Sequence, residues 1–239
     1  MSIIDRNKLK KAFEVGAIPS QEDFANLIDS FVHKEDSGFV SQEQGLRLSP
    51  KGENNKIITI FNNLSDLNEK WSLEKKKTQN NFSLNFLNKN KEVVLSLLEE
   101  KKVGVNTDSP KTTLEVNGSL SMKSRIGTFA AGKVPADGNW YIIVANLNDC
   151  KAFEIIAKAG KKGKGLYSMI HGIALSTFGK SNNKIKLTDA SYGSFLNKID
   201  LKWQGETFNY NLQIRTRLNY GENSFIKYHI CSLWDEDFF

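Results

Sequence analysis

The segment Lys102–Leu120, KVGVNTDSPKTTLEVNGSL, constrains the fold of this chain most. Val103 and Val105 alternate with small or polar residues, and Leu114 and Val116 do the same, which is the period of a half-buried β-strand. A proline-bearing turn between the two runs and an Asn-Gly pair after them keep each strand very short. Strands this small are seldom stable alone in water. We therefore expect an interface with other copies of the chain, formed by Val103, Val105, Leu114, Val116 and Leu120.

Two motifs in the first half of the chain carry a resemblance. Val103-Gly-Val-Asn-Thr-Asp-Ser-Pro110 followed by Leu114-Glu-Val-Asn-Gly-Ser119 resembles a stem segment of phage tail fibres and of adhesins on bacterial contractile injection systems. Residues 9–13, 16–19, 24–31 and 33–36 resemble the opening of fibre-like proteins from Bacteroidetes and their phages, with Ser20 where that pattern usually has Thr. The resemblance implies a homo-oligomer, a trimer in the first instance, and a phage tail or contractile-injection baseplate protein as partner.

Residues 1–38 are predicted to be a helical attachment module. Gly16 and Pro19 end a first helix, and Ser20 with Asp23 forms a capping arrangement that begins a second. Apolar residues then recur at helical spacing, so the module presents an apolar face. About 35 residues cannot bury such a face internally. We expect this face to dock on a particle, and its members are Phe13, Phe24, Leu27, Ile28 and Phe31.

The rest of the chain is predicted to be mainly β. Residues 39–101 hold short alternating runs at 45–48, 57–61, 71–73, 82–86 and 93–97, which indicate a β-meander or a small β domain whose apolar side threefold packing would cover. Residues 102–124 are the expected oligomerising stem. Residues 125–239 are predicted to be a β-sandwich, jelly-roll-like head, with strand candidates at 140–145, 152–157, 167–175, 184–187, 198–203, 208–215 and 225–231.

Charge is distributed unevenly along the chain. The formal net charge is +6, and residues 123–239 carry 16 Lys and Arg against 10 Asp and Glu, so the whole excess lies there. A basic surface suits anionic glycans or phosphorylated envelope polymers, although it is equally typical of a solvated surface that promotes solubility. We expect no nucleic-acid partner. The first residues lack the pattern of a signal peptide and no apolar run is long enough for membrane insertion. The expected location is the cytoplasm during synthesis and the outside of the cell on a particle.

Candidate receptor-binding residues lie in two predicted loops of the head. Gly160–Gly165 contains Lys161, Lys162 and Lys164, but it lacks the order of a phosphate-binding loop and the helix that would follow. A basic hairpin that contacts an anionic receptor is the better interpretation. Tyr220, between Asn219 and Gly221, is the best surface aromatic. Trp140 and Trp203 are expected in the core.

Catalytic chemistry finds weak support. Ser168 and His171 are three residues apart in a predicted strand, hence on opposite faces. Glu154, Asp189, Asp200 and Glu206 leave glycoside cleavage open, because the separation of two carboxyl groups is a three-dimensional quantity. The histidines are too scattered for a metal site, and Cys150 and Cys231 are expected to be free and buried. We expect no enzyme, no cofactor and no metal.

The sequence thus predicts a tail-fibre or adhesin-like structural protein whose head binds a cell-surface glycan or protein receptor. Two alternatives stay open. One is a purely structural particle component, such as a collar or baseplate decoration. The other is a polysaccharide depolymerase or toxin. The acidic and aromatic end, Ser232–Phe239, either closes the last strand or contacts a neighbouring protein.

Overall fold

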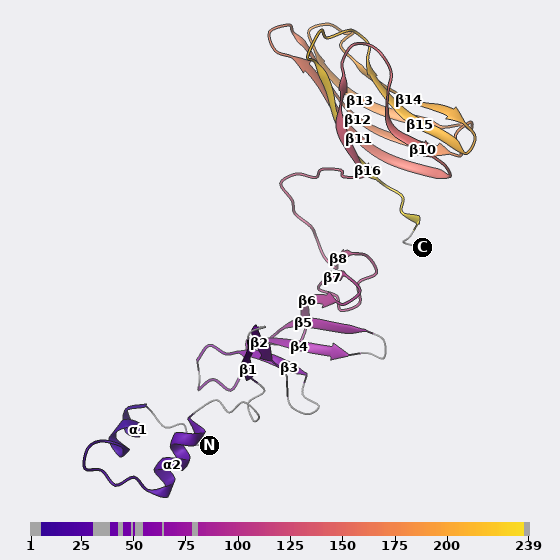
Figure 1. Cartoon of the computed structure of the whole chain (residues 1–239). Helices are drawn as coiled ribbons and strands as arrows, with labels where there is room; N and C mark the ends of the chain where they lie inside the picture. Colours follow the sequence, from indigo (N-terminus) through magenta and orange to yellow (C-terminus); the bar gives the residue numbers. More distant parts are fainter. Residues whose placement is uncertain are drawn as a thin grey trace. The chain divides into compact units, whose positions relative to one another are not determined.

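The computed structural model describes residues 6–30, 39–42, 45–48, 50, 55–63, 65–77 and 81–236. The chain divides into two compact units, Met1–Leu120 and Ser121–Phe239, and each is described by itself (Figure 1). The expectation of a mainly β protein with short N-terminal helices is confirmed. Among the described residues, no helix has both the length and the apolar character needed to cross a bilayer.

Two short helices open the first unit. They are α1 (Arg6–Ala12) and α2 (Gln21–Asp29). The predicted cap is confirmed, because the backbone N–H of Asp23 donates to Ser20 Oγ at 3.3 Å and Asp23 Oδ2 accepts from the backbone N–H of Ser20 at 2.8 Å. The Ser20 hydroxyl also donates to Asp23 Oδ2 at 2.6 Å, and this bond, followed by the one from the Ser20 backbone N–H, lowers the pKa of the Asp23 carboxyl. The capping box therefore fixes where α2 begins.

The remaining strands of the first unit form a hairpin and a six-stranded sheet. The hairpin pairs β1 (Phe39–Gln42) with β2 (Gly45–Leu48). The sheet has the order β3-β4-β5-β6-β7-β8, and all its neighbours are antiparallel except the parallel pair β7 and β8. Its strands are β3 (Lys56–Ile60), β4 (Trp71–Lys77), β5 (Phe82–Asn88), β6 (Val93–Leu98), β7 (Lys102–Val105) and β8 (Leu114–Val116).

The two very short strands predicted around Pro110 are thus present as β7 and β8, but they extend the sheet of the preceding region. Because β7 pairs with β6 along its whole length, one sheet runs across the predicted boundary between residues 101 and 102. The sequence motif was interpreted as a separate element since the pairing partner of a four-residue strand cannot be deduced from its own alternation.

The connection from β7 to β8 crosses one face of the sheet. Ser96 Oγ in β6 donates to the carbonyl oxygen of Thr107 at 2.7 Å, and Pro110 is buried. A Cβ atom at Gly104 would lie 2.3 Å from that same carbonyl oxygen and 2.5 Å from Ser96 Oγ. The glycine of the Val-Gly-Val motif is therefore required by the close approach of this loop.

The second unit consists of two antiparallel sheets. The larger has the order β13-β12-β11-β16-β9 and the smaller the order β10-β15-β14. The strands are β9 (Ala130–Pro135), β10 (Tyr141–Leu147), β11 (Cys150–Lys161), β12 (Leu166–Thr177), β13 (Lys184–Tyr192), β14 (Ile199–Glu206), β15 (Asn209–Thr216) and β16 (Phe225–Ser232). All seven predicted strands are present. β9 was missed because Ala-Ala-Gly-Lys-Val-Pro has no apolar alternation.

One hydrophobic core joins these two sheets. Phe153 in β11 is fully buried, and its ring lies 6.2 Å from that of Trp203 in β14 and 4.9 Å from that of Phe129. Inward positions of both sheets complete the core. Its fully buried side chains include Ile155, Ile170, Ala174, Ile199, Leu212, Ile214, Ile226 and Ile230.

Candidate functional site

The six-stranded sheet of the first unit has one apolar face. In the register of the sheet, Leu73, Phe86, Leu95 and Val105 lie opposite one another in consecutive strands, and Val116 lies beside Val105. Residues opposite each other in a sheet point to the same side. We call this surface the stem face, and its members are Ile58, Ile60, Trp71, Leu73, Phe82, Leu84, Phe86, Leu95, Leu97, Val103, Val105, Leu114 and Val116.

Among the described residues of the first unit, nothing covers the stem face. Ile60 is 55% exposed, Trp71 43% and Leu114 57%, and no member of the face is buried. The opposite face of the same sheet is largely polar, yet Ser72, Asn85 and Ser96 on it are buried, as is Leu87. The usual distribution of apolar and polar residues over a one-sided sheet is therefore inverted in the single chain.

Four of the five predicted interface residues thus lie together. Val103, Val105, Leu114 and Val116 form one end of the stem face, where the first two and the last are half-buried. Leu120 follows the sheet and is 63% exposed. The sequence did not reveal that Phe86, Leu97 and their neighbours belong to the same surface, although the alternation in residues 82–86 and 93–97 was visible. The register that aligns these rows was the missing information.

The predicted attachment face of the helices is also exposed. Phe24 and Ile28 are exposed, Leu27 is half-buried, and no residue of α2 is buried. The rings of Phe13 and Phe24 meet edge to face at 5.5 Å and join the two helices. Phe31 lies outside the described residues.

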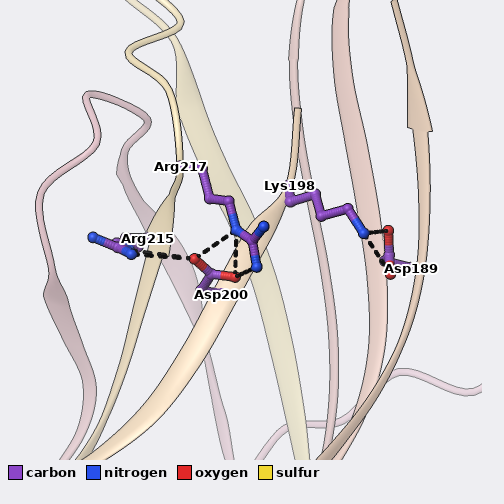
Figure 2. A network of polar contacts seen from close by, with 5 residues as sticks. All are labelled: Asp189, Lys198, Asp200, Arg215 and Arg217. Carbon is purple, nitrogen blue, oxygen red and sulfur yellow. Dashed lines mark hydrogen bonds and ion pairs between the residues drawn. The ribbon is translucent and has the colours of Figure 1, made fainter. Parts of the chain in front are cut away.

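A network of charges lies on β13, β14 and β15 of the second unit (Figure 2). Asp200 accepts a hydrogen bond from Arg217 Nε at 3.0 Å and lies 3.4 Å from the guanidinium nitrogens of Arg215. Asp189 pairs with Lys198 at 3.2 Å. Asp200 and Arg215 lie opposite each other on β14 and β15. One carboxylate therefore holds two guanidinium groups on the outside of the smaller sheet.

Trp140 belongs to the same outer surface. Its ring has Lys202 Nζ at 4.5 Å and Arg215 Cζ at 4.5 Å from the centroid, within cation–π range. The prediction that Trp140 lies in the core is therefore wrong, whereas Trp203 does pack on core residues. The prediction failed because Trp140 precedes β10. The alternation of inward and outward side chains in that strand begins at Tyr141 and does not include Trp140.

The basic loop and Tyr220, both predicted to bind a receptor, differ in how far their side chains are exposed. Lys162 and Lys164 are exposed in the turn between β11 and β12, while Lys161 is half-buried and donates to the backbone oxygen of Glu222. Tyr220 is 2% exposed, so the prediction of a surface aromatic is wrong. Its backbone N–H donates to the carbonyl of Ala136 at 2.8 Å, which turns the ring into the core.

Two buried tyrosines of the second unit make a matched test. Tyr210 Oη donates to the carbonyl oxygen of Asp149 at 2.6 Å, whereas among the described residues Tyr220 Oη forms no hydrogen bond of good geometry and interacts only with the Ser168 hydroxyl. Burial raises the pKa of both phenols. We expect Tyr210→Phe to lower the free energy of unfolding by about 0.5–1.5 kcal/mol, because it removes one of the two hydrogen bonds that the Asp149 carbonyl accepts, the other coming from the backbone N–H of Phe178 at 3.3 Å. Tyr220→Phe is expected to change it by less than about 0.5 kcal/mol. Urea titration of both variants checks this, and equal losses would contradict it.

The residues considered for catalysis do not converge. Ser168 is buried on the inner side of β12, and His171 is exposed on the outer side with Nε2 3.0 Å from Glu154 Oε1, so the prediction of opposite faces is confirmed. Each of the four carboxylates considered for glycoside cleavage is paired with a cation or a histidine: Glu154, Asp189, Asp200 and Glu206. The described residues contain no group of three or more His, Cys, Asp and Glu side chains arranged to hold a metal ion.

Two further predictions concern the cysteines and the last residues of the chain. Cys150 and Cys231 form no disulfide, as expected, but both are half-buried rather than buried. The backbone N–H of Leu233 donates to the carbonyl of Ala152 at 2.8 Å, so the chain continues along β11 after β16 ends. This is the first of the two roles considered for that segment; residues 237–239 lie outside the described part.

A second row of exposed apolar side chains lies on the outer side of β12. Tyr167, Met169, Ile173 and Leu175 alternate there with the buried residues of the same strand, and His171 interrupts them. At one end, Leu175 and Trp234 line a hollow of about 430 Å³. A central strand that is apolar on both sides is typical of a sheet covered on both sides. This surface is therefore a candidate for contact with another protein.

Comparison with known proteins adds no assignment, because no protein-family model and no curated protein matches the chain.

Proposed function

We propose that the chain is a subunit of a tail fibre or adhesin, which associates with copies of itself through the stem face and binds a target through its C-terminal unit. The observation that carries the proposal is the uncovered apolar face. Among the described residues of the first unit, thirteen neighbouring apolar positions have no covering layer, against the usual direction of burial.

The size of the stem face supports a specific interface. Its large side chains would each expose on the order of 200 Å² if fully solvated. Seven of them are between 37% and 57% exposed, which leaves roughly 600 Å² of apolar surface, at the upper limit of the largest patch on a typical monomer. Stable complexes bury about 800 Å² per partner. The half-buried members and the flanking residues supply the difference.

The partner that suits this face best is the same face of another copy. Apart from Lys75 and Lys77 in β4, the side chains that share the face with the apolar residues are uncharged, so two copies meet without like-charge repulsion at the centre. A closed ring of three copies would cover each face with two neighbours. We favour the trimer because it matches the resemblance of the stem motif.

The roles of the two ends follow from the same proposal. The exposed apolar face of α1 and α2 docks on a phage tail or contractile-injection baseplate protein. The basic C-terminal unit, which we interpret as a β-sandwich head, binds a cell-surface glycan or protein. Three heads on one stem raise the effective concentration at a repetitive surface, so weak single contacts give firm attachment. The protein is made in the cytoplasm and acts outside the cell on a particle.

A binding experiment with whole cells tests the proposal. The full-length protein, fluorescently labelled, is expected to adhere to a subset of bacterial strains, and a variant that is monomeric through a change in the stem face is expected to bind at least tenfold more weakly, because it loses multivalency. Flow cytometry measures both. Failure of the full-length protein to bind any strain in a broad panel of Bacteroidetes would contradict receptor binding.

The outer surface of β12 favours a second function. If the head of a particle component packs on other particle proteins, its exposed apolar row at Tyr167, Met169, Ile173 and Leu175 would be covered in that assembly. The chain would then be a collar or baseplate decoration. Retention of cell binding by a Met169→Lys variant, which places a charge in this row, would favour the adhesin instead.

A further inference from the structure

The outer surface of the smaller sheet in the second unit combines an aromatic ring with positioned cations. Lys202 Nζ and Arg215 Cζ each lie 4.5 Å from the centroid of the half-buried Trp140 ring. Lys202 and Arg215 come from the neighbouring strands β14 and β15. Two paired strands therefore hold the cations, and Trp140, which supplies the ring, directly precedes β10 of the same sheet.

Asp200 fixes the guanidinium groups of this surface. It lies 3.4 Å from Arg215 and 3.0 Å from Arg217, and its side chain is 19% exposed, against 36% and 46% for the two arginines. A guanidinium has five N–H donors in a planar fork. Since one carboxylate is shared by two arginines, the network holds their planes in place and leaves donors available to a second anion (Figure 2).

The local charge is positive but moderate. In the described part of the chain, Lys198, Arg215 and Arg217 pair with two carboxylates, Asp189 and Asp200, while Lys202 lies over the Trp140 ring. These four cations and two carboxylates give a surplus of two positive charges. This surplus suits a ligand with one or two well-separated anionic groups. A densely charged polyphosphate would meet the two carboxylates inside the cluster, so the balance disfavours nucleic acid.

Polar and apolar groups next to the cations complete the surface. Gln213 lies opposite Lys202 on one side and opposite Ile142 on the other, and Ile142 is 52% exposed. An amide side chain pairs with hydroxyl groups, and an isoleucine and an indole offer apolar contact to the C–H groups of a sugar ring. The neighbours of the arginines therefore match the chemistry of a saccharide.

We propose that the surface formed by Trp140, Lys202, Gln213 and Arg215 is a binding site for an anionic sugar, that is, a saccharide bearing a carboxylate or a sulfate. Arg215 and Lys202 bind the anionic group, Gln213 binds hydroxyl groups, and Trp140 with Ile142 contacts the ring. This site rests on the proposed receptor-binding function and names its ligand class. It is separate from the basic turn at Lys162 and Lys164.

The test uses the full-length protein and defined oligosaccharides. Isothermal titration with oligogalacturonate, which bears carboxylates, and with a heparin-derived oligosaccharide, which bears sulfates, is expected to show binding of at least one, and neutral galactose oligosaccharides are expected to bind at least about tenfold more weakly. Arg215→Gln and Lys202→Gln are each expected to weaken binding by about tenfold or more. Lys180→Gln removes the same charge from an exposed pair with Glu206 outside this surface and is the matched control.

Three outcomes would overturn the proposal. The first is no binding of either acidic oligosaccharide. The second is an equal loss in Arg215→Gln and Lys180→Gln, which would indicate nonspecific attraction. The third is tighter binding of a ten-residue single-stranded oligonucleotide than of either sugar.

Cell binding is measured in parallel: full adhesion by Arg215→Gln would show that the receptor site lies elsewhere and would leave the adhesin function standing. Since Trp140→Ala removes packing as well, Trp140→Phe is the variant to use, and it is expected to retain folding and lose affinity by a smaller factor.

Discussion

Leu97→Asp is expected to convert the proposed oligomer into a monomer of 27.0 kDa. Leu97 lies in β6 between Leu84 of β5 and Val103 of β7, near the middle of the stem face. It is 39% exposed in the single chain, so a charge there is tolerated by the isolated subunit but becomes buried and unpaired on association. Breaking an interface in this way costs several kcal/mol. Light scattering in solution measures the mass directly.

The control for this experiment is Asn90→Asp, which adds the same charge at an exposed turn between β5 and β6. It is expected to retain the mass of the parent protein. Val105→Asp and Val116→Asp are expected to behave like Leu97→Asp, since both lie on the same face. A parent protein that is already monomeric, or a Leu97→Asp variant with unchanged mass and native circular dichroism, would show that the stem face is not the interface.

Phe153→Ala is expected to destabilise the second unit by about 3–5 kcal/mol. The side chain is fully buried between the sheets, and its ring lies near those of Phe129 and Trp203. Removing it leaves a cavity that rigid strands on both sides cannot close. Phe195→Ala removes the same ring from a position that is 79% exposed and is expected to change stability by less than about 0.5 kcal/mol.

Urea unfolding followed by tryptophan fluorescence measures both variants, because Trp203 lies 6.2 Å from the deleted ring and reports on the core. Both changes are made in the monomeric Leu97→Asp variant, so that the proposed association does not contribute to the measured stability. A loss below about 1 kcal/mol for Phe153→Ala would mean that the two sheets do not depend on this contact.

Local patterns predicted much of the fold. Alternation predicted the strands of both units other than β1 and β9, and Ser20 with Asp23 predicted the start of α2. These signals depend only on neighbours in sequence. The same rule failed for β9, where small residues at paired positions leave no alternation to detect. It also made β7 and β8 look isolated, because their partner β6 is identified by pairing and not by composition.

The surfaces to which we assign a function were harder to predict for the same reason. The stem face needs the register of six strands, and the site around Trp140 needs the diagonal placement of Lys202 and Arg215 on two further strands. Tyr220 shows the opposite error. Polar and glycine neighbours indicate a turn, which is correct. A residue in a turn can still direct its side chain inward, as Tyr220 does, whose backbone N–H donates to the carbonyl of Ala136.

The loop from Asn106 to Thr113 has a consequence for the assembly that we propose. The loop passes over the side of the six-stranded sheet opposite the stem face, where Thr107 accepts a hydrogen bond from Ser96 Oγ. It therefore leaves the stem face as the side of the sheet that is open to association. A sheet with apolar faces on both sides can associate with further copies without limit. A sheet with one apolar face associates with a few copies, after which no apolar face is left to extend the assembly. The crossing therefore favours a particle of finite size and works against uncontrolled polymerisation.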